Sequence, residues 1–334
     1  MEPTSPLVPQ APWSQGAAIA ILLLSVAATP RAQQQRIVPG NEIVIGHSLV
    51  FSSDILEEER EIFVSLPASY AHSDQRYPVL YVLHGDFYFT YGTAYTERLA
   101  ARGDMPEVIT IGIPRSPSDN PRLIHGTPEA DVFLRFLEDE VISFVDETYR
   151  TLSHRTLSGW HYSASFTLHT LLSRPDLFNG FIAASIFPLR TETIDFSPLE
   201  RFLSSSEATK RTLYFGSDDT ERSIAVSTRE FGAQLDSLTL DNLHWHLDQS
   251  AGDGELTETV YRLLHPGLRA VYQDFRVPPF NDAASLNELG GLSFIDDFLA
   301  QRQATYGTPA TSNSQLIFSI LRVALSADDL SLFE

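Results

Sequence analysis

The side chains that could do chemistry gather around one predicted turn in the middle of the chain. Arg155–Ser158 is typical of a short strand, Gly159 follows it, and a helix is predicted from about Ser163. The turn carries His161 and Ser163, and both residue types can act as nucleophiles. A serine nucleophile also needs a histidine base, a carboxylate that orients this base, and backbone N–H groups that bind the oxyanion. This turn is therefore the strongest candidate for a reaction centre.

Other kinds of reaction centre receive little support. The chain has no cysteine, which excludes disulfides, thiolate metal sites and cysteine nucleophiles. His244 and His246 share one face of a predicted strand, Leu243–Leu247, but no carboxylate motif accompanies them. Such a pair is more often structural than metal-binding. We expect neither a metal nor another cofactor.

The elements around the turn predict an α/β fold. Tyr77–Leu83 and Val108–Ile113 are continuous apolar runs, typical of strands buried on both faces. Glu129–Tyr149 has apolar residues at i, i+3, i+4 and i+7, which indicates a long amphipathic helix. Alternating strands and helices predict a mostly parallel twisted sheet with helices on both faces. Further strands are expected at 42–51, 60–66, 181–185 and 212–215, and further helices at 95–102, 163–173, 221–237, 261–275, 294–304 and 315–324.

Six segments in series carry a resemblance to a known family. The apolar strand and the residues after it read YPVLYVLHGDFYF, and the predicted turn reads RTLSGWHYSASF. With the other segments, the chain resembles the putative-esterase family of α/β hydrolases, which includes esterase D and enterochelin-esterase-like proteins. The resemblance covers most of residues 50–275 and implies the α/β-hydrolase fold. The segments are Ser53–Tyr70, Tyr77–Phe89, Pro106–Pro114, Phe133–Thr151, Arg155–Phe178 and Gly267–Tyr272.

The resemblance implies a serine nucleophile at a position where this chain has another residue. Family members read R-x-L-x-G-x-S-x-G-G, and counting from Arg155 and Gly159 puts His161 in the nucleophile position. Ser163 is an alternative nucleophile if the turn is shifted by two residues. Otherwise Ser163 is a small residue in the first turn of the helix, where serine is common.

The chain matches the family pattern at the position of the catalytic acid but not at that of the catalytic histidine. The resemblance implies an acidic residue after the strand that ends at Phe215, and Glu221 is the best match, although an acidic residue also favours a helix start by itself. The catalytic histidine is expected in the loop 252–258, which contains none. His265 lies beyond that loop and is expected on the next helix.

A ligand-binding surface is expected beside the turn. The backbone N–H near Asp86 or Phe87, with that of Tyr162, is expected to form the oxyanion hole. Aromatic residues are expected to line the site, although aromatic rings also serve packing. They are Phe87, Tyr88, Phe89, Tyr91, Trp160 and Tyr162.

Charge and the N-terminal sequence limit the class of partner. The 334 residues include 43 acidic and 23 basic side chains, a net charge of −20, which argues against nucleic-acid binding. Ala17–Ala28 is apolar and too short to span a bilayer, so residues 1–32 are predicted to be a signal peptide that directs export to the periplasm or the extracellular space. No membrane association is expected after cleavage. We predict an esterase-like domain at 33–276 and a helical extension at 277–334.

Three functions remain open from the sequence. The first is an exported esterase-like protein that has lost its catalytic triad and binds a small ester-like ligand or a partner at the former active site. The second is an active serine carboxylic-ester hydrolase that uses Ser163 or a rearranged triad. An imidazole nitrogen within about 3.5 Å of the Ser163 hydroxyl, with a carboxylate behind it, would favour this second function. The third is a protein-interaction module.

Overall fold

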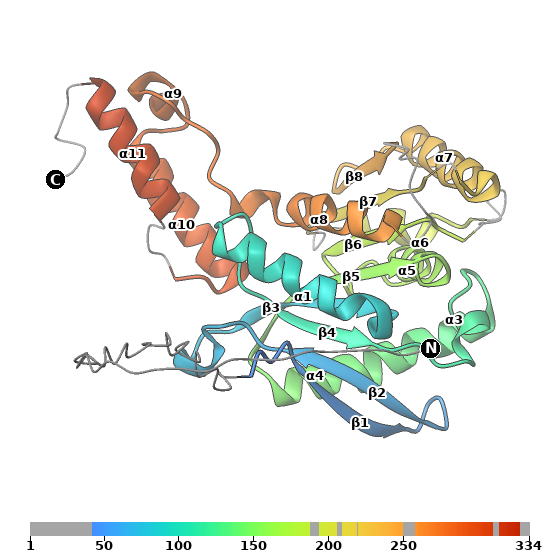
Figure 1. The fold of residues 1–334 in the computed structure, drawn as a ribbon. Coiled ribbons are helices and arrows are strands. Elements are labelled where there is room, and N and C mark those ends of the chain that lie inside the picture. Colours follow the sequence, from blue (N-terminus) through green and yellow to red (C-terminus); the bar gives the residue numbers. More distant parts are fainter. Residues whose placement is uncertain are drawn as a thin grey trace, which may run out of the picture. The chain divides into compact units, whose positions relative to one another are not determined.

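The computed structural model describes residues 42–187, 194–205, 209–218, 220–249, 258–309 and 314–327. Among them, eight strands form one sheet in the order β1-β2-β4-β3-β5-β6-β7-β8 (Figure 1). β1 and β2 pair antiparallel, β2 joins β4 antiparallel, and all later pairs are parallel. The predicted mostly parallel α/β fold is thus confirmed. The strands are β1 His47–Ser53, β2 Glu58–Ser65, β3 Tyr77–Leu83, β4 Ile109–Ile113, β5 Thr151–Trp160, β6 Gly180–Ala184, β7 Arg211–Gly216 and β8 Leu243–Asp248.

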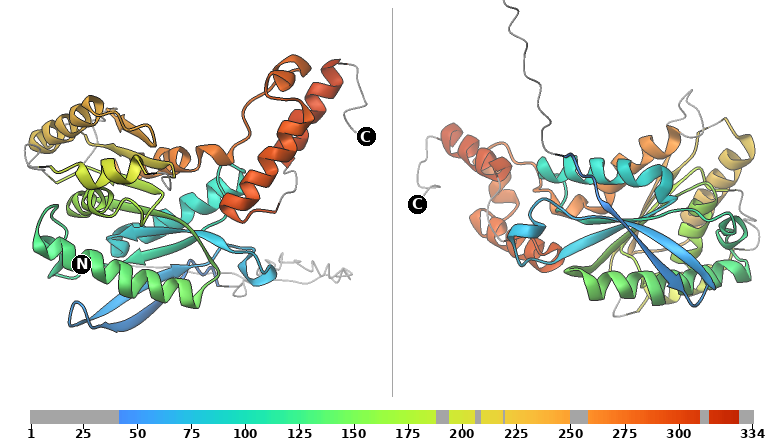
Figure 2. Two further views of the ribbon diagram at one scale, coloured as in Figure 1. Left: turned by 180° about the vertical axis from the view of Figure 1, so that it is seen from behind. Right: turned by 60° about the horizontal axis from the view of Figure 1, so that its bottom comes forward.

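Helices cover both faces of the sheet, and each face has its own apolar core. One core joins the sheet to the helices from α3 to α7, with Phe166 and Phe231 fully buried in it. The other core joins the opposite face to α1 and α8, through side chains such as Leu99 and Leu268. Figure 2 shows α1 and α8 on one side of the sheet and α4 on the other. The helices are α1 Gly85–Ala101, α2 Asp119–Arg122, α3 Pro128–Arg135, α4 Ser143–Thr148, α5 Tyr162–Ser173, α6 Ser197–Leu203, α7 Arg222–Ser237, α8 Thr259–Val271, α9 Ala283–Glu288, α10 Leu292–Tyr306 and α11 Ser314–Ala327, with shorter 3₁₀ turns η1 Tyr70–His72 and η5 Gln273–Phe275.

Two predicted helices differ from the observed ones. The helix predicted at 95–102 begins ten residues earlier, at Gly85, because packing against the sheet stabilises a segment whose glycine, threonine and aromatic residues have modest helix propensity. A Cβ at Gly92 would lie 3.0 Å from a methyl group of Val82, so the helix lies very close to β3. The helix predicted at 129–149 forms, but its middle part, η2 Phe136–Ile142, is a π-helix. α6 was not predicted.

The C-terminal segment has a small core of its own. Phe280, Leu286, Phe298 and Val323 bury their side chains together from the segment before α9 and from α9, α10 and α11. α10 also joins the main body, since Tyr306 is buried in the core beneath α1 and α8. The boundary at 276/277 stays a prediction.

No helix among the described residues is long and apolar enough to cross a membrane. The predicted signal peptide, including Ala17–Ala28, lies outside the described residues.

Candidate active site

His161 lies at the tip of a sharp turn between β5 and α5. Its backbone has φ 55° and ψ −113°, a conformation that residues other than glycine rarely adopt. A Cβ at Gly159 would lie 2.2 Å from the carbonyl oxygen of Ser163, so only glycine fits on the strand side of the turn. The backbone thus has the strained strand-to-helix form that carries the nucleophile in α/β hydrolases, and it presents an imidazole there.

Two neighbouring strands end in similarly strained residues. His84 follows β3 with φ 55°, and Ser185 follows β6 with φ 50°. Main-chain hydrogen bonds hold the tips together, because the His161 N–H donates to the Ala184 carbonyl at 3.0 Å and the Phe187 N–H donates to the His161 carbonyl at 3.1 Å. Such strain persists only where surrounding contacts impose it, and it concentrates at functional sites.

Ser163 lies two residues beyond the tip, and its hydroxyl closes the turn. The side chain is fully buried, its Oγ donates to the Trp160 carbonyl at 2.8 Å, and it accepts from the Trp160 N–H at 2.9 Å. The Nδ1 atom of His84 lies 3.4 Å from the same Oγ. An imidazole is therefore within the expected distance of Ser163.

The second part of that arrangement, a carboxylate behind the imidazole, is not present in the described structure. The Nε2 atom of His84 is buried and has no hydrogen-bond partner among the described residues. Burial lowers the pKa of His84 to about 4, which outweighs the opposite influence of Asp86, so the ring is neutral and weakly basic at pH 7.

His161 is a neutral imidazole at pH 7, only partly exposed. Burial lowers its pKa, and the negative charge of Glu221 acts in the opposite direction but does not reverse the shift. Glu221 itself is exposed and precedes α7, and the described structure contains no hydrogen bond between the two side chains. Glu221 is thus close enough to influence His161 but does not orient it.

A buried carboxylate that we did not select from the sequence, Asp218, lies nearer than Glu221 to the end of β7. Asp218 is 1% exposed and accepts hydrogen bonds from the Thr220 N–H at 2.9 Å and from the hydroxyls of Thr220 and Thr259. Burial favours the neutral acid, but these hydrogen bonds prevail and the pKa of Asp218 is lowered. Its place two residues after the strand was the available signal in the sequence. In the described structure, this carboxylate is bonded to the hydroxyl of Thr259 at the start of α8 and to no imidazole.

Aromatic rings surround the tip. The His161 ring lies 4.6 Å from the ring of Tyr162 and 5.3 Å from that of Phe187, which stack on each other at 4.3 Å. The Trp160 ring lies 5.4 Å from that of His161 and 5.8 Å from that of Tyr88. A neutral imidazole here is therefore flanked by rings that could stack on a planar ligand.

The outer aromatic residues are divided between two faces. Phe87 and Tyr91 are 58% and 42% exposed, and Tyr91 packs on Tyr261 at 4.1 Å. Phe89, expected to line the site, is buried against Phe63 instead, so that expectation was wrong. Helical geometry explains the difference, because Phe87 and Phe89 are about 200° apart around α1.

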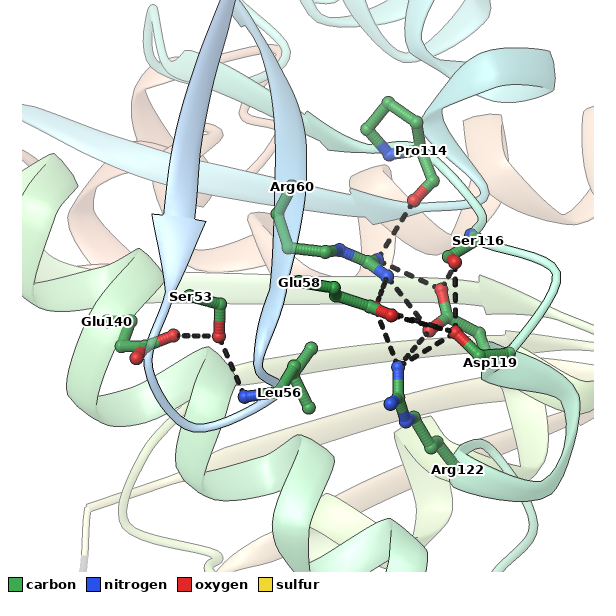
Figure 3. A network of polar contacts seen from close by, with 10 residues as sticks. Ser53, Leu56, Glu58, Arg60, Pro114, Ser116, Asp119, Arg122 and Glu140 are labelled. Carbon is green, nitrogen blue, oxygen red and sulfur yellow. Dashed lines mark hydrogen bonds and ion pairs between the residues drawn. The ribbon is translucent and has the colours of Figure 1, made fainter.

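The loop after β4 is held against the site by a buried ionic network. Arg60 of β2 donates to both carboxylate oxygens of Asp119 at 2.9 Å, and both side chains are 2% exposed (Figure 3). Arg60 also donates to the Pro114 carbonyl at 3.2 Å. Next in the loop, the Arg115 N–H donates to Asp86 at 3.1 Å. The side chain of Asp86, a residue expected at the ligand site through its backbone N–H, thus anchors this loop to the start of α1.

Three hollows of about 480, 330 and 420 Å³ are lined by described residues, and His161 lines none of these three. The described part of the chain brings no three metal-ligating side chains together. A ligand at the tip would therefore meet the aromatic rings around His161.

Comparison with known proteins agrees with this architecture. Residues 53–215 match the family model described as "Putative esterase". The curated Bacillus subtilis (strain 168) protein YjcH, described as uncharacterized, is 28% identical over 181 residues, which are 51% of this chain and 72% of YjcH.

Solved structures show the same fold. An IroE-like serine hydrolase from Shewanella oneidensis superimposes with a TM-score of 0.63 at 20% identity, covering 86% of this chain and 96% of that one. The enterobactin esterase FES from Shigella flexneri gives a TM-score of 0.53 at 17% identity, covering 72% of this chain and 62% of that one. The predicted resemblance to the putative-esterase family is therefore confirmed, and so is the predicted α/β-hydrolase fold.

Proposed function

We propose that this chain is an exported esterase-like protein that binds a small ester-like molecule around His161 and does not hydrolyse it through a serine triad. One observation carries the proposal: His161 occupies the strained tip of the turn, while the hydroxyl of Ser163 is buried and bonded to the Trp160 backbone. Removing a catalytic serine or histidine from such a triad lowers turnover by about 10⁶-fold. A chain without a serine at the tip is therefore expected to have negligible activity by the family mechanism.

The side chains around the tip indicate the chemistry of the ligand. Neutral His161 can donate one hydrogen bond and accept one, which suits a carbonyl or hydroxyl group. Trp160 and Tyr162 flank it with aromatic faces, which suit a planar or acyl group. The first N–H groups of a helix have no acceptor within it, so those of Asp86 and Tyr162 are the candidates to bind a carbonyl oxygen. The Phe87 N–H donates to the His84 carbonyl at 3.0 Å instead.

A thermal-shift screen followed by calorimetry tests the proposal. Short-chain aryl esters and catecholate esters should raise the melting temperature of the wild-type protein, and His161→Ala and Trp160→Ala should abolish this effect. Phe318→Ala is the control, since Phe318 is 71% exposed on α11 and outside the site. Stabilisation that survives in both site variants, or no stabilisation by any ester, contradicts ligand binding at the tip.

A second candidate is serine catalysis through Ser163, favoured by its 3.4 Å separation from His84 Nδ1. Reaction would need the hydroxyl to leave both Trp160 backbone contacts and reach solvent. Covalent labelling by a fluorophosphonate distinguishes this candidate from the first, as set out below.

A further inference from the structure

The largest of the three described hollows lies on the sheet face that α8 covers. Its volume is about 480 Å³, and it is bounded by β7, β8 and the C-terminal part of α8 with the residues that follow. Register places Thr212 opposite His244 and Tyr214 opposite His246 on its floor. The Tyr214 and His246 rings stack at 4.9 Å with an interplanar angle of 22°. The floor is therefore a flat aromatic surface.

Two arginines form the wall above this floor. Arg269 and Arg276 both line the hollow. The Nη1 atom of Arg276 is buried and has no hydrogen-bond partner among the described residues. Burial lowers the pKa of Arg276, the positive charge of Arg269 lowers it further, and the negative charges of Asp104 and Asp274 act in the opposite direction. The hollow thus has two guanidinium groups in its lining, and the charge of one acts on the other.

Three carboxylates lie near this wall, and each of them also interacts with another group. Asp104 lies 3.9 Å from Arg269 but is closer to Arg102, at 3.3 Å. Asp274 pairs with Lys210 at 2.9 Å. Asp248 accepts the hydrogen bond of the Tyr214 hydroxyl at 2.7 Å.

We propose that this hollow is a binding site for a small organic oxyanion, with its phosphate or carboxylate group between Arg269 and Arg276 and its planar part on the Tyr214–His246 pair. Guanidinium groups bind both kinds of oxyanion through parallel N–H donors. An anion between the two arginines would offset their like charges. In a chain of net charge −20, a local pair of cations is also where an anion would concentrate.

Calorimetric titration of the full chain with inorganic phosphate and with benzoate, at constant ionic strength, tests this proposal. Phosphate probes the charged part of the site, and benzoate adds a planar ring to a carboxylate. We expect saturable binding of at least one of them, with the dissociation constant raised at least about tenfold in Arg276→Gln and in Arg269→Gln.

Arg98→Gln is the matched control, because Arg98 is exposed on α1 and its loss changes net charge equally. It should bind like the wild type. The proposal is overturned if neither anion binds saturably up to about 10 mM, or if the three variants weaken binding equally, which would indicate only a general effect of charge. Melting temperatures without ligand show whether the variants remain folded.

Discussion

The Nδ1 atom of His84 lies 3.4 Å from the Oγ atom of Ser163, at the ends of two neighbouring strands. This pair has the separation of a base and its nucleophile, but the hydroxyl is committed to the Trp160 backbone and the imidazole has no carboxylate partner among the described residues. The contact is therefore best explained as packing beneath the turn, and it leads to the first prediction.

Ser163 is not expected to react with an activated phosphonate. Wild-type protein exposed to a fluorophosphonate probe should remain unlabelled, because the hydroxyl is fully buried. Turnover of p-nitrophenyl acetate should be the same in wild type and Ser163→Ala. Ser163→Ala should instead lower the free energy of unfolding by about 1–3 kcal/mol through loss of its hydrogen bonds. Labelling that disappears in Ser163→Ala, in a protein still folded by circular dichroism, would support serine catalysis.

The backbone strain at His161 should appear as a difference in the free energy of unfolding between two variants. His161→Gly should have a free energy of unfolding about 1 kcal/mol higher than His161→Ala, because only glycine adopts φ 55° without a steric penalty. Urea denaturation compares the two variants, which remove the same ring contacts. Val226, exposed on α7, is the control site, and there alanine should be the more stable by about 1 kcal/mol. An alanine advantage at both sites would contradict strain at the tip.

The buried ion pair below the loop should be costly to break from one side. Arg60→Met should lower the free energy of unfolding by about 3–5 kcal/mol, since it leaves Asp119 buried and short of its main partner. Arg60→Met/Asp119→Leu should recover most of this loss.

A more exposed arginine provides the control for that cycle. Arg174→Met should cost about 1 kcal/mol or less, because Arg174 and its two partners, Glu138 and Asp176, are 39%, 26% and 51% exposed. Urea denaturation of Arg60→Met, Asp119→Leu and the double variant, each compared with wild type, gives the coupling energy. A double variant no more stable than Arg60→Met would show that the arginine acts through packing on Phe136 and not through charge.

Buried histidines should make the protein less stable in mild acid. Burial lowers the pKa of His84 and His125 to about 4, below the value of about 6.5 in the unfolded chain. The unfolded state therefore binds more protons between these values, so stability falls as pH decreases from about 6.5 to about 4. Chemical denaturation at pH 7 and pH 5 should show this loss, and His125→Gln should reduce it. A pH-independent difference between wild type and variant would contradict the shift.

The fold could be predicted further than the site. The central strands could be predicted from continuous apolar runs such as Tyr77–Leu83, because a strand buried on both faces needs apolar side chains on both. The start of α1 could not be predicted, since Gly85 is a weak helix former whose position depends on close contact with β4. Counting from Gly159 placed His161 at the tip, where the backbone indeed turns.

The neighbours of the tip depended on contacts that a linear pattern does not contain. Asp218 and Thr259 are far apart in the chain, and their hydrogen bond forms only when α8 packs on the sheet. Phe89 shares its sequence context with Phe87, but the direction of its side chain depends on the angle of α1 to the sheet.

The main-chain bonds that join His161 to Ala184 and Phe187 involve no side chain of the tip residue. The shape of the turn is consequently imposed by its neighbours and does not depend on which side chain stands at its apex. A substitution at position 161 would thus alter the chemistry offered at the tip while leaving in place the hydrogen bonds that shape it.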